Sequence, residues 1–356
     1  MNEPVAKRRR LSRLRLSVTT RRKLVSVLLA TIVFSLCSAV TTLAVRRPVE
    51  LGVANAIFIG LGVGLFEEFY VQSPQGRWLR SMRPLRSIPI YIGVVVVLYL
   101  IAVHVVHLLL GRLDDLPTVY ARLPWGLSFF AAFSVVGILV MRVAHFIGTK
   151  TLLDLALGTY HRPVLEKRML LFLDIQSSTA LAERLGAFGM REFVSKFLFD
   201  VSKPITDHGG DIYLYTGDGL IASWNWADAI RQDTILRAID AMFAAVADER
   251  PVYERQFGTA PVFRIGVHGG DVVVSEQGDT KRSIGIYGDA INIAARMEQA
   301  AKAHGVSCIL SADVVDALTD RADIEMIGEE AAKGITTPIR IWARREKAKP
   351  LSKPLR

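Results

Sequence analysis

The chain has 356 residues, of which 51% are hydrophobic and 22% are charged, and its formal net charge is +10. The two ends carry this excess: residues 1–23 hold nine basic and one acidic side chain, and residues 344–356 hold six and one. The part between them is slightly acidic. This argues against a nucleic-acid-binding protein, which needs basic side chains spread over a folded face. Basic ends beside apolar segments instead fit a surface of anionic lipid.

Apolar residues concentrate before residue 147 in four segments, at 24–45, 51–66, 88–110 and 125–147. A helix needs about 20 apolar residues to cross a bilayer core, and the first, third and fourth segments meet that length. The second is shorter and rich in glycine but can extend to Tyr70. We therefore expect a basic cytosolic tail over residues 1–23 and then a transmembrane domain with four helices over residues 24–147.

The distribution of Lys and Arg predicts the orientation of these helices. The N-terminal tail, the loop over residues 71–87 and the exit at Lys150 are basic, and short basic flanks stay in the cytosol. A multi-pass protein of the inner (plasma) membrane with both termini cytosolic is therefore expected.

Polar side chains inside the apolar segments are functional candidates, because burying them in lipid is costly. They are Asn55, His104, His107, Arg142 and His145. His104 and His107 are three residues apart and share a helix face. They either bind a haem or a metal, or make hydrogen bonds between helices, or lie near the membrane interface.

The sequence after a connector over residues 148–168 alternates between strand-like and helix-like stretches. In chain order the expected elements are a strand at 169–174, a helix opened at 177–179, a helix at 188–207, a hairpin of 211–215 and 220–224, a helix at 227–249, a hairpin of 262–268 and 271–275 around Gly269-Gly270, a helix at 289–304, a strand at 306–310, a helix at 312–318, and strands at 324–327 and 339–343. This order predicts an α+β domain over residues 169–345 with a mostly antiparallel sheet and packed helices. A basic tail over residues 346–356 follows.

Two carboxylates stand where these strands end. Asp174 closes the first strand, and Asp218 lies at the tip of the first hairpin. If these strands are neighbours, both carboxylates lie at one edge of the sheet and can hold Mg²⁺, which keeps few protein ligands. The amides of residues 175–179 open a helix, and a helix N-terminus is a natural triphosphate site. Taken singly, Asp174 also fits a helix N-cap and Asp218 a plain turn residue.

A later helix supplies a second polar set. Asn292 and Arg296 are four residues apart and share a face. Arg offers a fork of N–H groups to phosphate, and Asn can orient a ribose oxygen. A solvated helix face is the alternative for either residue alone, and Lys333, before the last strand, says little by itself.

Together these motifs resemble the catalytic domain of class III adenylyl and guanylyl cyclases, membrane-anchored bacterial type, across about residues 165–345. The matching stretches, in family order and spacing, are Leu171-Phe172-Leu173-Asp174-Ile175-Gln176-Ser177-Ser178-Thr179, Gly209-Gly210, Thr216-Gly217-Asp218-Gly219, Arg264-Ile265-Gly266-Val267-His268-Gly269-Gly270, Tyr287-Gly288-Asp289-Ala290-Ile291-Asn292-Ile293-Ala294-Ala295-Arg296-Met297-Glu298 and Lys333-Gly334.

The resemblance implies the following roles. Asp174, Asp218 and the Ile175 carbonyl bind two Mg²⁺ or Mn²⁺ ions per active site, and Ser177, Ser178 and Thr179 open the phosphate-binding helix. Asn292, Arg296 and Lys333 are catalytic: Asn292 positions the ribose, Arg296 stabilises charge on the phosphates, and Lys333 contacts the terminal phosphates. The family builds each site from two catalytic domains, so this chain is expected to work as a homodimer.

The chain departs from the family at the positions that usually read the purine. Where adenylyl cyclases have Lys and Asp or Thr, and guanylyl cyclases Glu and Cys, this sequence has Leu214 and Gly285. ATP is favoured because the guanine-type Glu is absent, so the expected function is a membrane-bound adenylate cyclase that makes cyclic AMP. A guanylate cyclase using GTP, and an inactive cyclase-like membrane receptor or scaffold, are the alternatives.

Overall fold

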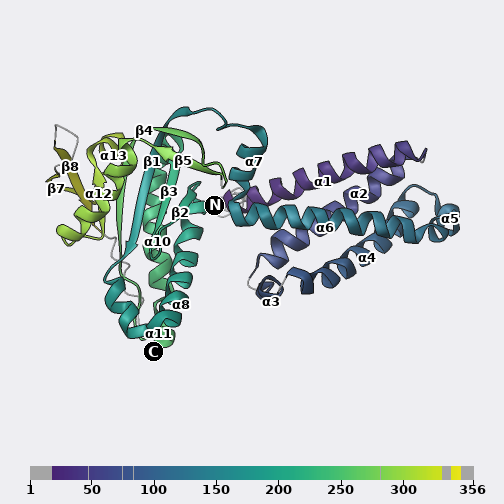
Figure 1. The fold of residues 1–356 in the computed structure, drawn as a ribbon, viewed down its shortest axis with the longest axis horizontal. Coiled ribbons are helices and arrows are strands. Elements are labelled where there is room, and N and C mark those ends of the chain that lie inside the picture. Colours follow the sequence, from purple (N-terminus) through teal and green to yellow (C-terminus); the bar gives the residue numbers. More distant parts are fainter. Residues whose placement is uncertain are drawn as a thin grey trace, which may run out of the picture. The chain divides into compact units, whose positions relative to one another are not determined.

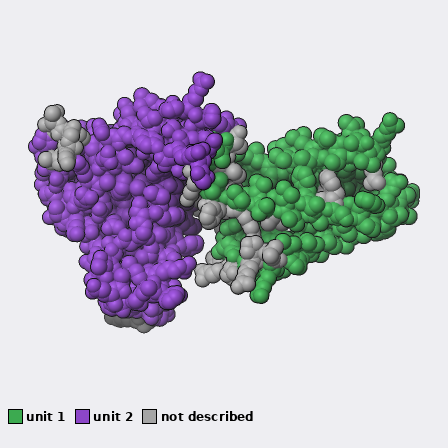
Figure 2. All heavy atoms as spheres, viewed as in Figure 1, with its two compact units in different colours: residues 1–156 green, residues 157–356 purple. Residues whose placement is uncertain are grey.

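The computed structural model describes residues 18–46, 48–73, 75–82, 84–280, 282–330 and 338–345. The chain divides into two compact units, Met1–Ala156 and Leu157–Arg356, which Figure 2 draws in different colours. Each unit has its own core and is described by itself.

The first unit is helical (Figure 1). Its described helices are α1 (Val18–Ala44), α2 (Val49–Leu65), the π-helical turn η2 (Phe66–Val71), α3 (Arg77–Ser81), α4 (Pro84–Leu109), the 3-10 turn η3 (Leu113–Asp115), α5 (Leu116–Ala121), α6 (Leu123–Ile147) and, at the boundary, α7 (Thr149–Leu157).

Three helical stretches of this unit are long and apolar enough to cross a membrane: Lys23–Ala44, Val49–Val71 and Arg86–Leu109. The pair Leu113–Ala121 and Leu123–Gly137 passes the same test only when the two are taken together, and it bends by 76°. Large apolar side chains stand exposed along α1, with Leu43 69% exposed. Such surfaces are rare on soluble monomers and fit contact with lipid.

Helices α1 and α2 approach each other closely through small residues. A Cβ added at Gly52 would stand 2.2 Å from the Thr42 methyl, and one at Gly60 would stand 3.2 Å from the Thr31 main chain. Gly52, Ala56, Gly60 and Gly64 follow one another at intervals of four residues, a spacing of small residues that is typical of helices that associate within membranes. The glycines of the second apolar segment therefore have a packing role.

The second unit is built on a single eight-stranded sheet (Figure 1). Its elements are β1 (Val164–Ile175), α8 (Ser178–Asp207), β2 (Asp211–Tyr215), β3 (Leu220–Asn225), α9 (Trp226–Ile230), η4 (Arg231–Asp233), α10 (Thr234–Asp248), α11 (Arg250–Phe257), β4 (Phe263–Gln277), β5 (Ser283–Tyr287), α12 (Asp289–Ala303), β6 (Cys308–Ser311), α13 (Ala312–Ala317), β7 (Ile324–Glu330) and β8 (Ile339–Arg344).

The strand order is β2-β3-β1-β4-β6-β8-β7, with β5 paired to β4. The pairings within the described residues are antiparallel except for β4 with β6. The odd-numbered residues of β1, such as Leu171, face the main core with α8 and α10. Leu170, which points to the other face, packs in a smaller cluster with α12. The expected α+β architecture, mostly antiparallel with packed helices, is confirmed.

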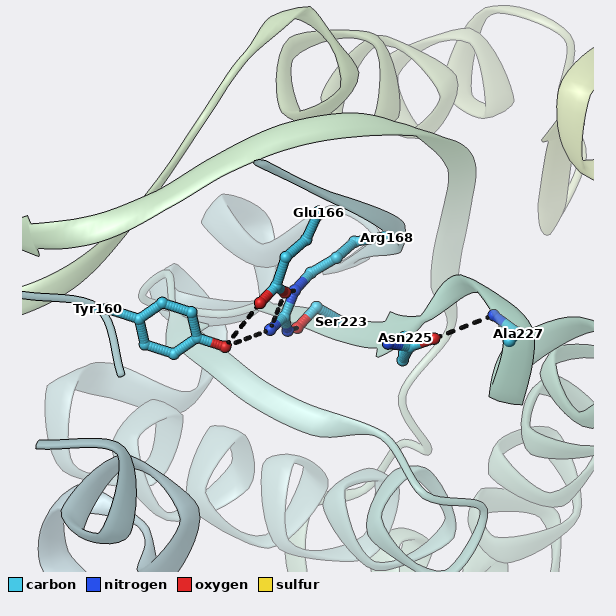
Figure 3. A network of polar contacts seen from close by, with 6 residues as sticks. All are labelled: Tyr160, Glu166, Arg168, Ser223, Asn225 and Ala227. Carbon is cyan, nitrogen blue, oxygen red and sulfur yellow. Dashed lines mark hydrogen bonds and ion pairs between the residues drawn. The ribbon is translucent and has the colours of Figure 1, made fainter. Parts of the chain in front are cut away.

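A buried polar network secures the beginning of this unit (Figure 3). The Arg168 guanidinium, on β1, donates to Glu166 at 2.7 Å, to the Tyr160 hydroxyl at 3.0 Å and to the Ser223 hydroxyl at 3.3 Å. The Tyr160 main-chain carbonyl accepts from the Glu276 N–H at 2.9 Å. Tyr160, in the expected connector, is only 6% exposed, so this part of the connector belongs to the fold of the second unit.

Three local expectations differ from the structure. Strand β1 begins at Val164, five residues earlier than expected. The hairpin expected around Gly269-Gly270 is wrong, because β4 runs through it as one strand. The helix expected at 227–249 is broken where Gln232 and Asp233 take left-handed backbone conformations with φ of 52° and 51°.

Candidate active site

Two carboxylates meet at one end of the neighbouring strands β1 and β3. Asp174 is the penultimate residue of β1, and Asp218 lies in the turn that leads into β3. The β1–β3 pairing sets Leu173 opposite Leu220, and the two carboxyl groups hydrogen-bond to each other. Burial, then the negative charge of Asp218 and then that of Glu298, raise the pKa of Asp174 to about 6. The positive charge of Arg264 opposes this only in part, and Arg264 also pairs with Glu298.

Glycine allows this close approach. A Cβ at Gly219 would lie 2.1 Å from the Leu173 carbonyl oxygen and 3.1 Å from the Asp174 carboxylate. Any other residue would push the turn, and Asp218 with it, away from β1. Gly217 supports the same turn with a left-handed φ of 80°, where glycine carries little strain.

The start of α8 lies next to the pair along the chain. Ser177 adopts a left-handed φ of 55°, and the helix that begins at Ser178 is interrupted at Gly186, where φ is 68°, so that the expected break between two helices is present. Ser177 and Thr179 are exposed and Ser178 is half-buried, so the first turn can be approached from solvent. The free N–H groups of a helix start favour anions. The Ile175 side chain is 2% exposed in the main core, which leaves its main-chain carbonyl as the group it can offer.

These donors fit a hard divalent cation. The pKa of Asp174 is raised because two carboxyl groups lie close together, and a main-chain carbonyl lies beside them. Mg²⁺ and Mn²⁺ prefer such oxygen ligands. Among the described residues there is no cluster of three or more His, Cys, Asp or Glu side chains that could hold a metal.

Helix α12 carries Asn292 and Arg296. Asn292 is exposed and Arg296 half-buried, while Ala290, Ala294 and Met297 of the same helix are buried against the sheet. Glu298 makes an ion pair of 3.2 Å with Arg264, and its negative charge raises the pKa of Asp174. Glu298 and Asn292 are separated by about 120° around the helix, at 100° per residue. Asn292 therefore points in a different direction from Glu298, whose charge acts on Asp174.

The two positions expected to read the purine, Leu214 and Gly285, lie in β2 and β5, which a side-chain hydrogen bond joins. The Ile286 N–H donates to the Tyr213 hydroxyl at 3.1 Å, which brings β2 next to β5 and sets Leu214 and Gly285 in one region. Leu214 is 52% exposed. A Cβ at Gly285 would stand 2.7 Å from the Tyr287 ring, whose hydroxyl donates to Gln277.

Sequence reasoning overlooked Tyr213, Gln277 and Tyr287. Their proximity depends on the bulge in β2 between Ile212 and Leu214 and on the β4–β5 pairing. Neither leaves a clear signal in one sequence. Lys333, expected to contact phosphate, lies outside the described residues.

A sheet of this order, with paired carboxylates at one edge and an Asn–Arg pair on the last long helix, defines the catalytic domain of a class III nucleotide cyclase. Residues 164–343 match the family described as the adenylate and guanylate cyclase catalytic domain, and the chain belongs to it.

The chain is 31% identical over 199 residues to adenylate cyclase 2 of Rhizobium meliloti, which covers 55% of each chain. It is 31% identical over 151 residues to an adenylate cyclase of Anabaena cylindrica, covering 41% of this chain and 30% of that one. It thus spans about half the length, or less, of these relatives. A bacterial light-regulated adenylyl cyclase has the same fold, with a TM-score of 0.54 at 18% identity over 62% of this chain and 64% of that chain.

Proposed function

We propose that the protein is a membrane-bound adenylate cyclase that converts ATP to 3′,5′-cyclic AMP and pyrophosphate. The observation that carries the proposal is the Asp174–Asp218 carboxyl pair beside the start of α8. Two carboxylates beside a helix N-terminus bring a cation site and a phosphate site together. Relatives named adenylate cyclases favour this reading.

In the proposed reaction the chain's own groups bind and orient the triphosphate. Asp174, Asp218 and the Ile175 carbonyl hold two Mg²⁺ or Mn²⁺ ions, and the first turn of α8 receives phosphate oxygens. When bound, such ions lower the pKa of the 3′-hydroxyl and neutralise charge at the α-phosphate and the pyrophosphate. Asn292 fixes the ribose, Arg296 stabilises charge on the phosphates as the bond to pyrophosphate breaks, and Lys333 holds the terminal phosphates.

The proposed active form is a homodimer with two equivalent sites. Asn292 lies about 120° around α12 from Glu298, the residue of this helix whose charge acts on Asp174. In the proposed dimer a triphosphate sits between two chains, with the ions on one and the Asn–Arg pair on the other. The separation of Asn292 from the carboxylate side of its own helix supports this arrangement.

ATP is the proposed substrate and GTP the second candidate. Leu214 has no polar group and Gly285 has only its main chain, so neither position offers the guanine-type carboxylate. Base selection then rests on main-chain groups or on neighbours such as Gln277. Turnover of ATP and GTP side by side separates the two substrates.

The proposed anchor is four membrane-spanning helices over residues 24–147, with the bent pair counted as the fourth span. Both termini are cytosolic in this proposal, because the N-terminal tail, the loop over residues 71–87 and the exit at Lys150 carry the basic residues that stay on the cytosolic side. The connector over residues 148–168 and the catalytic domain over residues 169–345 then lie in the cytosol, where nucleoside triphosphates are available.

The decisive experiment uses membranes that contain the full chain, with Mn²⁺ and either ATP or GTP. Cyclic AMP should form, and Asp218→Ala and Arg296→Ala should each abolish it. Co-expression of the two variants should restore about a quarter of the activity, because half of randomly formed dimers contain one intact site of two. Nucleotide binding without turnover under every metal would instead identify an inactive receptor or scaffold. Activity that is not restored would exclude the shared site.

A further inference from the structure

The space beside Gly285 is filled by side chains from both strands of the β4–β5 pair. A Cβ added at Gly285 would stand 2.7 Å from the Tyr287 ring and 2.8 Å from Gln277 Oε1. Gln277 lies opposite Ser283, and Gly285 lies two residues further along β5, opposite Ser275. Residues that are diagonal in this way share one face of a sheet. The Gln277 amide therefore occupies the volume that a side chain at position 285 would fill.

The main chain of Gly285 is directed into the sheet. The Ile286 N–H points away from β4 and donates to the Tyr213 hydroxyl at 3.1 Å. Hydrogen-bonded and non-hydrogen-bonded positions alternate along an antiparallel pair. The N–H and C=O of Gly285 therefore face β4, where Ser275 is its partner in the register. A polar group that meets a ligand at this place must come from a neighbouring residue.

Two hydroxyl groups hold the Gln277 amide in place. Gln277 Oε1 accepts from the Tyr287 hydroxyl, and Gln277 Nε2 donates to the Ser283 hydroxyl at 3.2 Å. An amide oxygen can accept two hydrogen bonds, and an amide nitrogen can donate two. These contacts leave one acceptor position and one N–H of Gln277 for a ligand. Because the Gln277 side chain is exposed, a ligand can reach both.

The charged side chains at this end of β4 and β5 are directed at each other. Arg282 lies 3.7 Å from the Glu276 carboxylate, which also stands 3.8 Å from the His161 ring. Leu214 is apolar and can contact a ring only by packing against it. Gln277 is thus left as the side chain near Gly285 that presents an uncharged donor and acceptor side by side.

This pattern matches the polar edge of adenine. The N6 amino group of adenine donates a hydrogen bond, and the ring nitrogen beside it accepts one, so a Gln amide can pair with adenine through two hydrogen bonds. Resting on the proposed cyclase function, we propose that Gln277 reads the purine in place of the side chain that Gly285 lacks. Gln277 Oε1 accepts from the N6 amino group and Nε2 donates to the ring nitrogen. Tyr287 and Ser283 are positioning residues, because they act through the amide.

Gln277→Glu tests this pairing, because a carboxylate keeps the acceptor and loses the donor. The carboxylate would repel the lone pair on the adenine ring nitrogen, whereas guanine presents two neighbouring donors, N1–H and the N2 amino group. The ratio of kcat/KM for ATP to that for GTP should therefore fall at least about tenfold below that of wild type. Gln277→Met, with neither group, should lower kcat/KM for ATP about tenfold, mainly through KM.

Gln256→Glu is the matched control, because it adds the same charge at an exposed position on α11. It should leave the ratio of kcat/KM for ATP to that for GTP unchanged. An unchanged ratio in Gln277→Glu, or an equal fall in Gln256→Glu, would overturn the assignment. A general loss of structure would lower both kcat/KM values together and leave their ratio constant, so the ratio distinguishes base reading from misfolding.

Binding measurements separate this assignment from the proposed activity. The nucleotides 3′-deoxy-ATP and 3′-deoxy-GTP lack the attacking hydroxyl and therefore report base recognition without turnover. Their dissociation constants, measured with Mn²⁺ on the full chain in lipid nanodiscs, should shift towards guanine in Gln277→Glu. This shift without any cyclic nucleotide from ATP or GTP would overturn the proposed activity and support the base assignment. Cyclic nucleotide formation without the shift would overturn the base assignment alone, and failure of wild type to bind either analogue would overturn both.

Discussion

The carboxyl groups of Asp174 and Asp218 hydrogen-bond to each other, one at the end of β1 and one in the turn before β3. Burial and the charge of Asp218 raise the pKa of Asp174 from 3.8 to about 6. Because the pKa is higher in the folded state than in the unfolded state, the stabilising contribution is complete below about pH 4 and is lost as the pH rises through 6. At neutral pH the ionised pair therefore costs stability.

Asp218→Asn should separate stability from activity. Removing one negative charge relieves the repulsion, so the metal-free variant should melt about 3 °C above wild type at pH 7.5, the shift that about 1 kcal/mol gives in a chain of this size. The difference should shrink towards pH 4.5. Cyclase activity should fall at least about 100-fold, since charge stabilisation at the reacting phosphate is lost.

Thermal unfolding with and without Mn²⁺ is the measurement for this prediction. Mn²⁺ should raise the melting temperature of wild type and leave that of Asp218→Asn almost unchanged. Asp228→Asn is the control, because Asp228 is an exposed acid on α9. An equal Mn²⁺ shift in wild type and Asp218→Asn would show that the ion binds elsewhere.

The buried His268 predicts a second dependence on pH. Burial lowers the pKa of His268 below 6.5, and nearby Asp313 only partly opposes this. The ring lies 2.7 Å from the Ser311 hydroxyl through Nδ1 and 3.8 Å from Asp313. With a lower pKa in the folded state, the contribution to stability is present above about pH 6.5 and is lost as the pH falls through the folded-state pKa.

Between pH 7 and pH 5, His268 should therefore lower the free energy of unfolding, opposite in sign to the effect of Asp174, and the free energy of His268→Gln should decrease less, or increase more, than that of wild type over this range. Denaturant titration followed by tryptophan fluorescence measures both. His161→Gln serves as control, since the His161 side chain is 75% exposed. An unchanged slope in His268→Gln would mean that other groups cause the acid sensitivity.

The Tyr160–Arg168 hydrogen bond predicts how firmly the connector holds the second unit. Tyr160→Phe removes the bonds to Arg168 and Glu166 while keeping the buried ring, and should cost about 1–2 kcal/mol of unfolding free energy. Arg168 keeps Glu166 and Ser223, so the fold should persist. If the free energy of unfolding does not change within error, the two hydrogen bonds of the Tyr160 hydroxyl shown in Figure 3 contribute no net stability.

A one-residue insertion after Gly158 tests whether the connector carries a signal. It shifts the chain between α7 and the anchored Tyr160, and should change cyclase activity if the membrane unit controls catalysis. An insertion after Gly258, in the loop between α11 and β4, is the matched control. Unchanged activity in both would favour a passive membrane anchor.

Much of the second unit follows from short-range patterns. The β2–β3 hairpin and α12 were predictable from turn residues and apolar periodicity, and the structure confirms both. Gly269-Gly270 misled the prediction because it imitates a turn. A Cβ at Gly269 would stand 2.1 Å from the Trp226 ring, and one at Gly270 would stand 3.1 Å from Ala290. These glycines make room for side chains from distant elements, which sequence spacing alone does not show.

The candidate site was partly predictable for the same reason. The positions of Asp174 and Asp218 at strand ends suggested one sheet edge, and the register places them there. The effect of Glu298 on the pKa of Asp174 could not be predicted, because it depends on how closely α12 packs against β4. A Cβ at Gly266 would stand 2.1 Å from the Glu298 main-chain N. Asn55 and His107 line one cavity although they belong to helices that are far apart in sequence. The sequence singled them out only because polar side chains are costly inside lipid.

The exposed Leu214 offers a direct test of base selection. Leu214→Lys would place an ammonium, which can only donate hydrogen bonds, at a position that is 52% exposed on β2. The N1 atom of adenine accepts a hydrogen bond, whereas N1 of guanine carries a proton, so the ratio of kcat/KM for ATP to that for GTP should rise about tenfold. Leu214→Met, similar in volume and without a donor, is the control. Gly285 is unsuited to such a change, since a Cβ there meets Tyr287 and Gln277. A ratio that stays constant in Leu214→Lys would show that the purine does not approach Leu214, and selection would then rest on main-chain groups.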